Sequence, residues 1–153
     1  MKRLSPRTGI GAAAIVALAL VATGAAYAVE ETPMDIPGGT MVTTDKAKAL
    51  FDGGAVFIDA RVANEYAEEH IKGAKNVLYK ETFPKVAKTD PADTFDPTKL
   101  PADKGTAMVF YCNGSPCWKG YKGAVEAIKV GYQKVNWYRD GIPAWKAAGH
   151  PVE

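Results

Sequence analysis

Cysteine and histidine are scarce in this chain of 153 residues, which contains two of each. Both cysteines, Cys112 and Cys117, lie in one short segment, and neither is closely followed by a histidine. A structural zinc site needs four ligands at characteristic spacings, and covalent haem attachment needs a Cys-x-x-Cys-His run. Neither pattern occurs in the sequence, so we expect no metal site and no cofactor.

An excess of one charge sign is also missing. The sequence has 19 lysine and arginine residues against 17 aspartate and glutamate residues. Residues 1–28 hold three of the basic residues and no acidic one, so the remaining 16 basic and 17 acidic residues give the rest of the chain a net charge of −1. Such a balance lacks the positive excess that is typical of nucleic-acid binding, and we expect no nucleic-acid partner.

No apolar run has the length and composition of a typical membrane-spanning helix, because the longest one, residues 10–21, is short and rich in alanine and glycine. Three basic residues precede this run, and the Ala-Tyr-Ala sequence at 26–28 is a small-x-small cleavage site. We therefore expect residues 1–28 to be a Sec-type signal peptide that is cleaved after Ala28. The mature protein would then be periplasmic or secreted, without stable membrane insertion, and an uncleaved N-terminal anchor is the alternative.

The rest of the chain is long enough for one domain with its own hydrophobic core and too short for two. Residues 29–42, with two prolines and two glycines, are expected to form an extended segment that precedes a domain at 43–153. Apolar runs typical of buried strands alternate in this domain with helical patterns. The expected strands are 55–58, 76–78, 106–111 and 135–138, and the expected helices are 45–51, 62–69, 118–130 and 142–148. This order predicts an α/β fold with a largely parallel central sheet and helices on both faces.

The segment from Met108 to Gly120 is the most informative part of the sequence. An apolar run ends at Cys112, a tight loop follows, and a helical pattern then begins. A cysteine between a strand end and a helix start lies near backbone N–H groups and the positive end of the helix dipole, which stabilise a thiolate. Cys112 is therefore the candidate nucleophile. A bond between Cys112 and Cys117 would close only a short ring and add little stability, so both cysteines are expected to act chemically.

Three stretches of the sequence resemble the rhodanese-like domain family. The first consists of Asp-Ala-Arg at 59–61, Glu-Tyr at 65–66 and His-Ile-Lys-Gly-Ala-Lys-Asn-Val at 70–77. The second is the strand, cysteine, loop and helix of 110–128. The third consists of Gly-Tyr at 131–132, Arg-Asp-Gly-Ile-Pro-Ala-Trp at 139–145 and Ala-Gly-His-Pro-Val at 148–152. The resemblance covers the chain from about residue 43 to its C-terminus. It implies a rhodanese-like fold for this region.

The resemblance also implies a sulfurtransferase in which the loop cysteine, here Cys112, carries a sulfane sulfur as a persulfide. Backbone amides of residues 113–117 are then expected to surround the sulfur, although proline at position 116 has no amide hydrogen to donate. The implied partners are a small sulfur-containing donor and a thiol or cyanide-like acceptor, and a periplasmic protein is a further candidate. The expected substrate-binding residues are Asn113, Gly114, Ser115, Pro116, Trp118 and Lys119.

Cys117 leaves a second function open. As a resolving thiol it could attack a persulfide on Cys112, release sulfide and leave a disulfide that needs a reductant. The protein would then be a thiol-disulfide oxidoreductase or a redox sensor. The third alternative is a non-catalytic binding module that holds a partner with the cysteine loop or with the connection at 80–104.

Other conspicuous side chains are expected to be structural. Asp59 at a strand end is predicted to cap the following turn and to pair with Arg61. His70 is expected to belong to a turn, because its counterpart in the resembling family does. Trp137 and Trp145 are expected in the core, whereas Trp118 could form a wall of the site. Beside the loop, Lys119 could favour an anionic donor or simply be a surface charge.

Overall fold

The computed structural model describes residues 31–153. The predicted signal peptide, residues 1–28, lies outside the described residues. Within residues 31–153, every helix is too short or too polar to cross a membrane.

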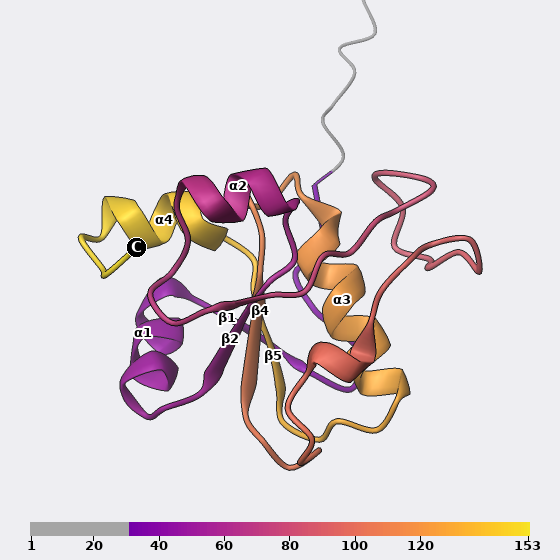
Figure 1. Cartoon of the computed structure of the whole chain (residues 1–153), viewed down its shortest axis with the longest axis horizontal. Coiled ribbons are helices and arrows are strands. Elements are labelled where there is room, and N and C mark those ends of the chain that lie inside the picture. Colours follow the sequence, from indigo (N-terminus) through magenta and orange to yellow (C-terminus); the bar gives the residue numbers. More distant parts are fainter. Residues whose placement is uncertain (1–30) are drawn as a thin grey trace, which may run out of the picture.

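A five-stranded sheet forms the centre of the domain (Figure 1). All of its strands run parallel, in the order β1-β5-β4-β2-β3. The strands are β1 (Thr40–Val42), β2 (Val56–Asp59), β3 (Lys75–Asn76), β4 (Met108–Tyr111) and β5 (Val135–Tyr138). β4 pairs with β5 on one side and with β2 on the other, so the strand that leads to Cys112 lies in the middle of the sheet. The parallel α/β fold predicted from the sequence is confirmed.

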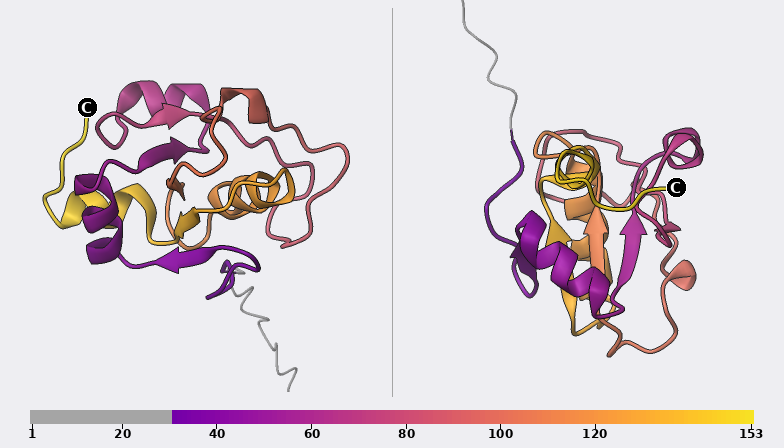
Figure 2. Two further views of the ribbon diagram at one scale, coloured as in Figure 1. Left: turned by 90° about the horizontal axis from the view of Figure 1, so that it is seen from below. Right: turned by 90° about the vertical axis from the view of Figure 1, so that its left-hand side faces the viewer.

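Helices cover both faces of this sheet (Figure 2). They are α1 (Thr44–Asp52), α2 (Ala63–Glu68), α3 (Trp118–Lys129) and α4 (Gly141–Ala147), with a 3-10 turn, η1, at Pro97–Lys99. Because side chains alternate along a strand, Val109 and Tyr111 enter the apolar layer beneath α1 and α4, whereas Phe110 enters the layer beneath α3. The sheet therefore separates two apolar layers, and burial on both faces explains why its central strands are continuously hydrophobic.

Two tryptophans anchor these layers. Trp145 of α4 is fully buried, lies 5.3 Å from the ring of Phe51, and donates its indole N–H to the Pro151 carbonyl at 2.9 Å. On the other face, Trp137 of β5 contacts Tyr121 edge to face at 5.1 Å. Such aromatic pairs add about 0.5–1.5 kcal/mol beyond the area they bury. The predicted core positions of Trp137 and Trp145 are confirmed.

The segment at 29–42 differs from its prediction where the structure describes it. It ends in β1, whose Thr40, Met41 and Val42 pair with β5, so part of this segment is an edge strand of the sheet itself. Ile36, just before β1, is 5% exposed and packs in the core. Three residues are too few for a visible alternation of apolar and polar side chains, which explains why the sequence pattern missed β1.

The connection at 80–104 makes specific contacts with the rest of the domain. A β-bridge joins Lys80 to Thr94, and the Tyr79 hydroxyl donates to Asp93 Oδ2 at 2.6 Å. Burial raises the pKa of Tyr79 most, and the hydrogen bond to Asp93 raises it further. These contacts hold the connection against the domain. Sequence patterning cannot reveal them, because they depend on which parts of the chain meet in three dimensions.

Candidate active site

The candidate site lies where the central strand gives way to a helix. β4 ends at Tyr111, the loop from Cys112 to Cys117 follows, and α3 begins at Trp118 (Figure 1). The loop is at the carboxyl end of a parallel sheet, which is the edge where α/β folds place their ligand sites. The N-terminus of α3 directs its free N–H groups and the positive end of its dipole towards the same loop.

Both cysteines of the loop are joined in a disulfide, with their Cα atoms 6.1 Å apart. Cys112 is 3% exposed, whereas Cys117 is half-buried at the start of α3. The structure therefore contains the oxidised form of the pair, in which neither sulfur is a thiolate. A nucleophilic role for Cys112 requires this bond to be reduced first.

The loop backbone departs from a complete ring of amides. The N–H of Cys117 donates to the Gly114 carbonyl at 3.0 Å, which closes a tight turn, and Pro116 has no N–H. Gly114 adopts a φ of +105°, a conformation that favours glycine. The expected set of amides around the sulfur, which already excluded Pro116, is therefore corrected at Cys117, because the turn at the end of the loop uses this amide internally.

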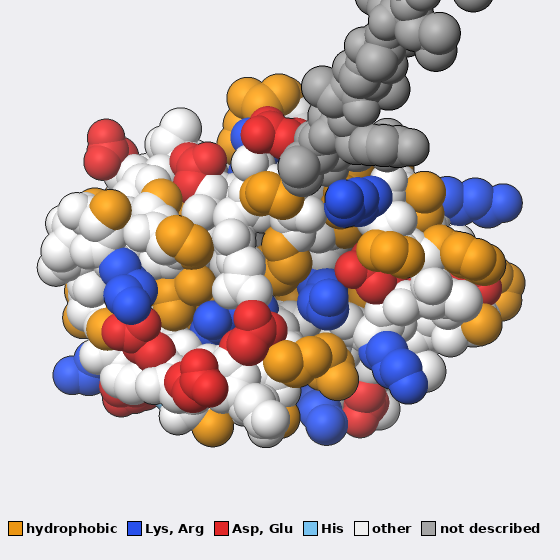
Figure 3. Space-filling view, turned by 90° about the horizontal axis from the view of Figure 1, so that it is seen from above, with side chains coloured by type: hydrophobic (Ala, Val, Ile, Leu, Met, Phe, Trp, Pro, Cys, Tyr) orange, Lys and Arg blue, Asp and Glu red, His pale blue; other side chains and the backbone are white. Residues whose placement is uncertain are grey.

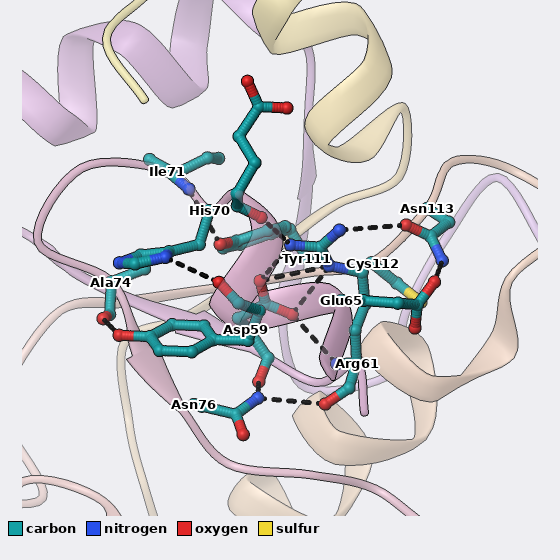
Figure 4. A network of polar contacts seen from close by, with 12 residues as sticks. Asp59, Arg61, Glu65, His70, Ile71, Ala74, Asn76, Tyr111, Cys112 and Asn113 are labelled. Atoms are coloured by element: carbon teal, nitrogen blue, oxygen red, sulfur yellow. Dashed lines mark hydrogen bonds and ion pairs between the residues drawn. The ribbon is translucent and has the colours of Figure 1, made fainter. Parts of the chain in front are cut away.

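One side of the loop is held by a charged pair at the end of β2 (Figure 4). Asp59 is fully buried, and its Oδ2 accepts a hydrogen bond from Arg61 Nη2 at 2.7 Å, while Oδ1 accepts from the Arg61 backbone at 2.9 Å. Arg61 Nη1 then reaches Asn113 Oδ1 at 3.3 Å, and Asn113 Nδ2 donates to Glu65 Oε1 at 2.5 Å. The predicted Asp59–Arg61 ion pair is confirmed, and it also fixes the residue that follows Cys112.

Burial and this ion pair change the pKa of Arg61 itself and of the neighbouring Tyr111. Burial alone would lower the pKa of Arg61, but the hydrogen bonds and negative charge of Asp59 outweigh it and raise this pKa. The pKa of Tyr111 is also raised, mainly by burial and further by Asp59. Tyr111 keeps its proton at all ordinary pH values, and its hydroxyl oxygen accepts from the Ile71 amide at 3.1 Å. Beneath the loop, Arg61 is therefore charged and Tyr111 neutral.

The start of α4 holds the loop from another side. The Ile142 amide donates to the Cys112 carbonyl at 3.0 Å. Gly141 has a φ of +62°, and a Cβ at this position would lie 2.6 Å from the Gly114 nitrogen and 3.0 Å from the Cys112 carbonyl carbon. Only glycine fits this approach without moving the backbone. The loop and the β5–α4 turn are thus in direct backbone contact.

A third restraint comes from the strap, which we define as residues 31–34. The backbone N–H and the hydroxyl of Thr32 both donate to the Ser115 carbonyl, at 2.9 and 2.8 Å. Arg139 donates from Nε and Nη2 to the Thr32 carbonyl and pairs with Glu31 at 2.8 Å. Thr32 is only 3% exposed. The strap therefore packs on the middle of the loop, although it lies 83 residues away in the sequence.

Comparison with known proteins identifies the fold and the family. The model of the rhodanese-like domain matches residues 43–148. The chain belongs to the rhodanese-like domain family. A curated mitochondrial relative from Arabidopsis thaliana, Protein HIGH ARSENIC CONTENT 1, is 26% identical over 129 residues, which cover 80% of this chain and 72% of the relative.

Solved structures agree with this assignment at the level of fold. The rhodanese-like domain from an Anabaena protein superimposes with a TM-score of 0.55 at 20% identity, over 74% of this chain and 77% of that one. A thiosulfate sulfurtransferase from Pseudomonas aeruginosa gives a TM-score of 0.56 at 24% identity and covers 75% of this chain. This chain spans only 20% of the Pseudomonas protein, so the likeness concerns one region of that enzyme.

Within this rhodanese-like domain, two predicted substrate-binding side chains have other contacts. Lys119 Nζ lies 3.4 Å from Glu81 Oε1, so its charge is not free for a donor. Trp118 is 4% exposed and packs edge to face on Tyr121 in the core, so it does not form an open wall. His70 lies just before the turn at 72–73 rather than in it, and its backbone N–H donates to the Glu153 carbonyl at 2.8 Å. Its ring stacks on Tyr66, and its Nδ1 lies 2.8 Å from the Tyr66 carbonyl oxygen.

The sequence did not indicate that three further residues of the rhodanese-like site contact the cysteine loop. They are Thr32 of the strap, Glu65 beside Asn113, and Gly141 against the Cys112 carbonyl. Glu65 and Gly141 do lie in the stretches that resemble the family, so the resemblance marked their positions without indicating their roles. No comparable signal exists for Thr32, because it lies before the matched region.

Proposed function

We propose that this protein is a sulfurtransferase in which Cys112 carries a sulfane sulfur as a persulfide. The observation that carries the proposal is the position of Cys112, at the carboxyl end of the central strand and in a loop that leads directly into the N-terminus of α3. Membership of the rhodanese-like domain family, which includes sulfurtransferases, supports it. The positive end of the helix dipole favours both a thiolate and a persulfide anion at this place.

The reaction would proceed in two displacements. The Cys112 thiolate attacks the outer sulfur of the donor, the sulfur–sulfur bond of the donor breaks, and its remainder leaves as a thiolate or a sulfur oxyanion. A thiol or cyanide-like acceptor then attacks the outer sulfur of the persulfide and regenerates the Cys112 thiolate. The amides of Asn113 and Gly114, which have no acceptor among the described residues, are available to stabilise the anion.

The disulfide fits this cycle as a resting form. Attack by the Cys117 thiolate on the inner sulfur of the persulfide forms the Cys112–Cys117 bond and expels sulfide. A dithiol, or two equivalents of a monothiol, must then reduce this bond before Cys112 can accept sulfur again. Export to the periplasm, which the N-terminal sequence predicts, would place the protein where such disulfides persist.

Thiol-disulfide exchange is the second candidate, and the disulfide itself favours it. Cys117 is the more exposed partner, so an incoming thiolate would reach its sulfur more easily than that of Cys112. The two candidates differ in their need for Cys117. Sulfur transfer requires Cys112 alone, whereas a dithiol-disulfide cycle requires both cysteines.

Intact-mass spectrometry of the reduced protein, before and after a sulfane-sulfur donor, tests the proposal. We expect Cys117→Ser to gain the mass of one sulfur atom and Cys112→Ser to gain none, whereas wild type gains this sulfur and then loses it as sulfide when Cys117 closes the disulfide. The loaded Cys117→Ser protein should pass this sulfur to cyanide as thiocyanate. If no form gains sulfur while wild type oxidises by loss of two hydrogens in a reaction that needs both cysteines, the sulfurtransferase proposal fails and the redox candidate stands.

A further inference from the structure

The cations at the candidate site are neutralised by acidic partners. Arg61 pairs with Asp59 at 2.7 Å, and Arg139 pairs with Glu31 at 2.8 Å. The side chain that immediately follows the loop, Lys119, lies 3.4 Å from Glu81. Each of these three basic side chains therefore has a carboxylate partner.

Glu81 is shared between two lysines of α3. Its Oε2 lies 3.2 Å from Nζ of Lys122, a side chain that is only 1% exposed. Asp93 lies 4.0 Å from the same ammonium group and balances it. This acid-base cluster, which we define as Lys119, Lys122, Glu81 and Asp93, thus holds two charges of each sign and offers no net positive charge to a ligand.

The carboxylates slightly outnumber the cations around the loop. Glu65 accepts from the Asn113 side chain, and the cation nearest to it, Arg61, is already paired with Asp59. Hydrogen bonds from Arg139, together with its charge, lower the pKa of Glu31, so this group is ionised at neutral pH. On this side of the molecule acidic and basic side chains are interspersed, with apolar side chains between them (Figure 3). A dianion would therefore meet a neutral to slightly negative surface.

Exposed apolar side chains flank the same region. Met34, at the end of the strap, is 66% exposed, and Phe83 is 57% exposed. The Phe83 carbonyl accepts from Lys122 Nζ at 2.7 Å, which places this residue beside the first turns of α3. An organic donor could bury part of its carbon skeleton against such side chains, whereas an inorganic oxyanion could not.

We propose that the physiological donor is an organic sulfane-sulfur compound with at most one negative charge at its reacting group, such as a thiol persulfide, rather than the doubly charged thiosulfate ion. This inference rests on the proposed sulfurtransferase function. The step is the one described above: Cys112 attacks the outer sulfur, and the organic part of the donor leaves with the electron pair of the broken sulfur–sulfur bond. The amides at the start of the loop and the dipole of α3 suffice for a single developing charge.

The test compares two donors that differ chiefly in charge. Methanethiosulfonate is a monoanion that leaves as methanesulfinate, and thiosulfate is a dianion that leaves as sulfite. For each donor, intact mass gives the second-order rate at which reduced wild type is consumed, with the persulfide and the disulfide that follows from it counted together as loaded protein. This rate is divided by the rate of the same donor with free cysteine. We expect this normalised rate to favour methanethiosulfonate by about tenfold or more, since one unpaired charge near a protein surface corresponds to that order of discrimination.

A matched pair of variants tests the role of the ion pairs. Glu81→Gln frees Lys119 and should raise the normalised thiosulfate rate about three- to tenfold, and the methanethiosulfonate rate only about two- to threefold, because the Coulomb energy scales with the charge of the donor. Glu126→Gln makes the same change in net charge, but Glu126 pairs with Lys129 at the far end of α3, and both rates should stay at the wild-type value. Thermal melting of each variant verifies that it is folded.

The outcomes separate this inference from the function on which it rests. Thiosulfate loading as fast as methanethiosulfonate loading in wild type, after normalisation, would overturn the inference and leave the sulfurtransferase proposal intact. Equal responses of both donors to Glu81→Gln would overturn the role assigned to the Lys119–Glu81 pair. If neither donor nor cysteine persulfide loads Cys112 of the reduced protein, the proposed function itself fails.

Discussion

Replacing Gly141 with alanine tests how closely the cysteine loop depends on the turn before α4. Gly141 has a φ of +62°, and an added Cβ would lie 2.6 Å from the Gly114 nitrogen and closer still to the Cys112 carbonyl oxygen. Both are backbone atoms, which cannot move aside as a flexible side chain can. The loop or the turn must therefore shift, and the hydrogen bond from Ile142 to the Cys112 carbonyl is the first contact at risk.

The cost has two parts. A left-handed conformation costs a non-glycine residue about 1–2 kcal/mol, and forcing extra atoms into a packed site adds about 1–3 kcal/mol. The sum, about 2–5 kcal/mol, corresponds to a fall in Tm of about 8–20 °C for a domain of this size. A displacement of about 1 Å at the reacting group can also slow a reaction about 100-fold, so sulfur loading should be impaired beyond the loss of stability.

Gly149→Ala is the matched control. Gly149 has a φ of +72°, but no atom lies within 4 Å of the position of its added Cβ. It should therefore show only the conformational cost, a fall in Tm of about 4–8 °C, and load sulfur at the wild-type rate. Calorimetry and intact-mass loading on reduced proteins measure both effects. Equal behaviour of the two variants would refute the claim that close backbone contact at Gly141 positions the loop.

Two further changes test the strap and the connection at 80–104. Thr32→Val removes the hydroxyl donor to the Ser115 carbonyl and should lower the free energy of unfolding by about 1 kcal/mol. It should also shift the equilibrium between the loop disulfide and dithiothreitol several-fold, and Thr32→Ser should restore both quantities. An unchanged equilibrium would contradict the idea that Thr32 positions the loop. Burial alone would raise the pKa of Asp93, but hydrogen bonds from the Asp90 amide, the Tyr79 hydroxyl and Thr82 hold this pKa below its ordinary value of 3.8. Asp93 therefore stabilises the fold at neutral pH and loses this effect as the pH falls below about 4. In urea titrations, the free energy of unfolding of Asp93→Asn should consequently decline less between about pH 5 and pH 2 than that of wild type. A decline as steep as in wild type would show that other carboxylates dominate.

The sequence alone was sufficient for the fold and for the position of Cys112. The strands that form the middle of the sheet are short apolar runs, and the helices that follow β4 and β5 have recognisable stops, because Gly131 and Gly149 adopt positive φ just after α3 and α4. These signals are local, because strand burial and helix capping depend on residues within one or two turns of each other. The alternation of strands and helices then fixes a parallel sheet, and this sheet places the end of β4 at its functional edge.

Only the tertiary structure decided how the loop is restrained and which charges remain available to a substrate. Thr32 meets Ser115 across 83 positions, and Lys119 meets Glu81 across 38. No sequence pattern predicts either pair, because Thr32 and Glu81 lie in segments without regular secondary structure. Lys119 therefore looked like a free cation in the sequence, although the fold supplies its counter-charge from the connection at 80–104. The sequence determined where Cys112, the proposed nucleophile, lies, and long-range packing determined the electrostatic environment of its loop.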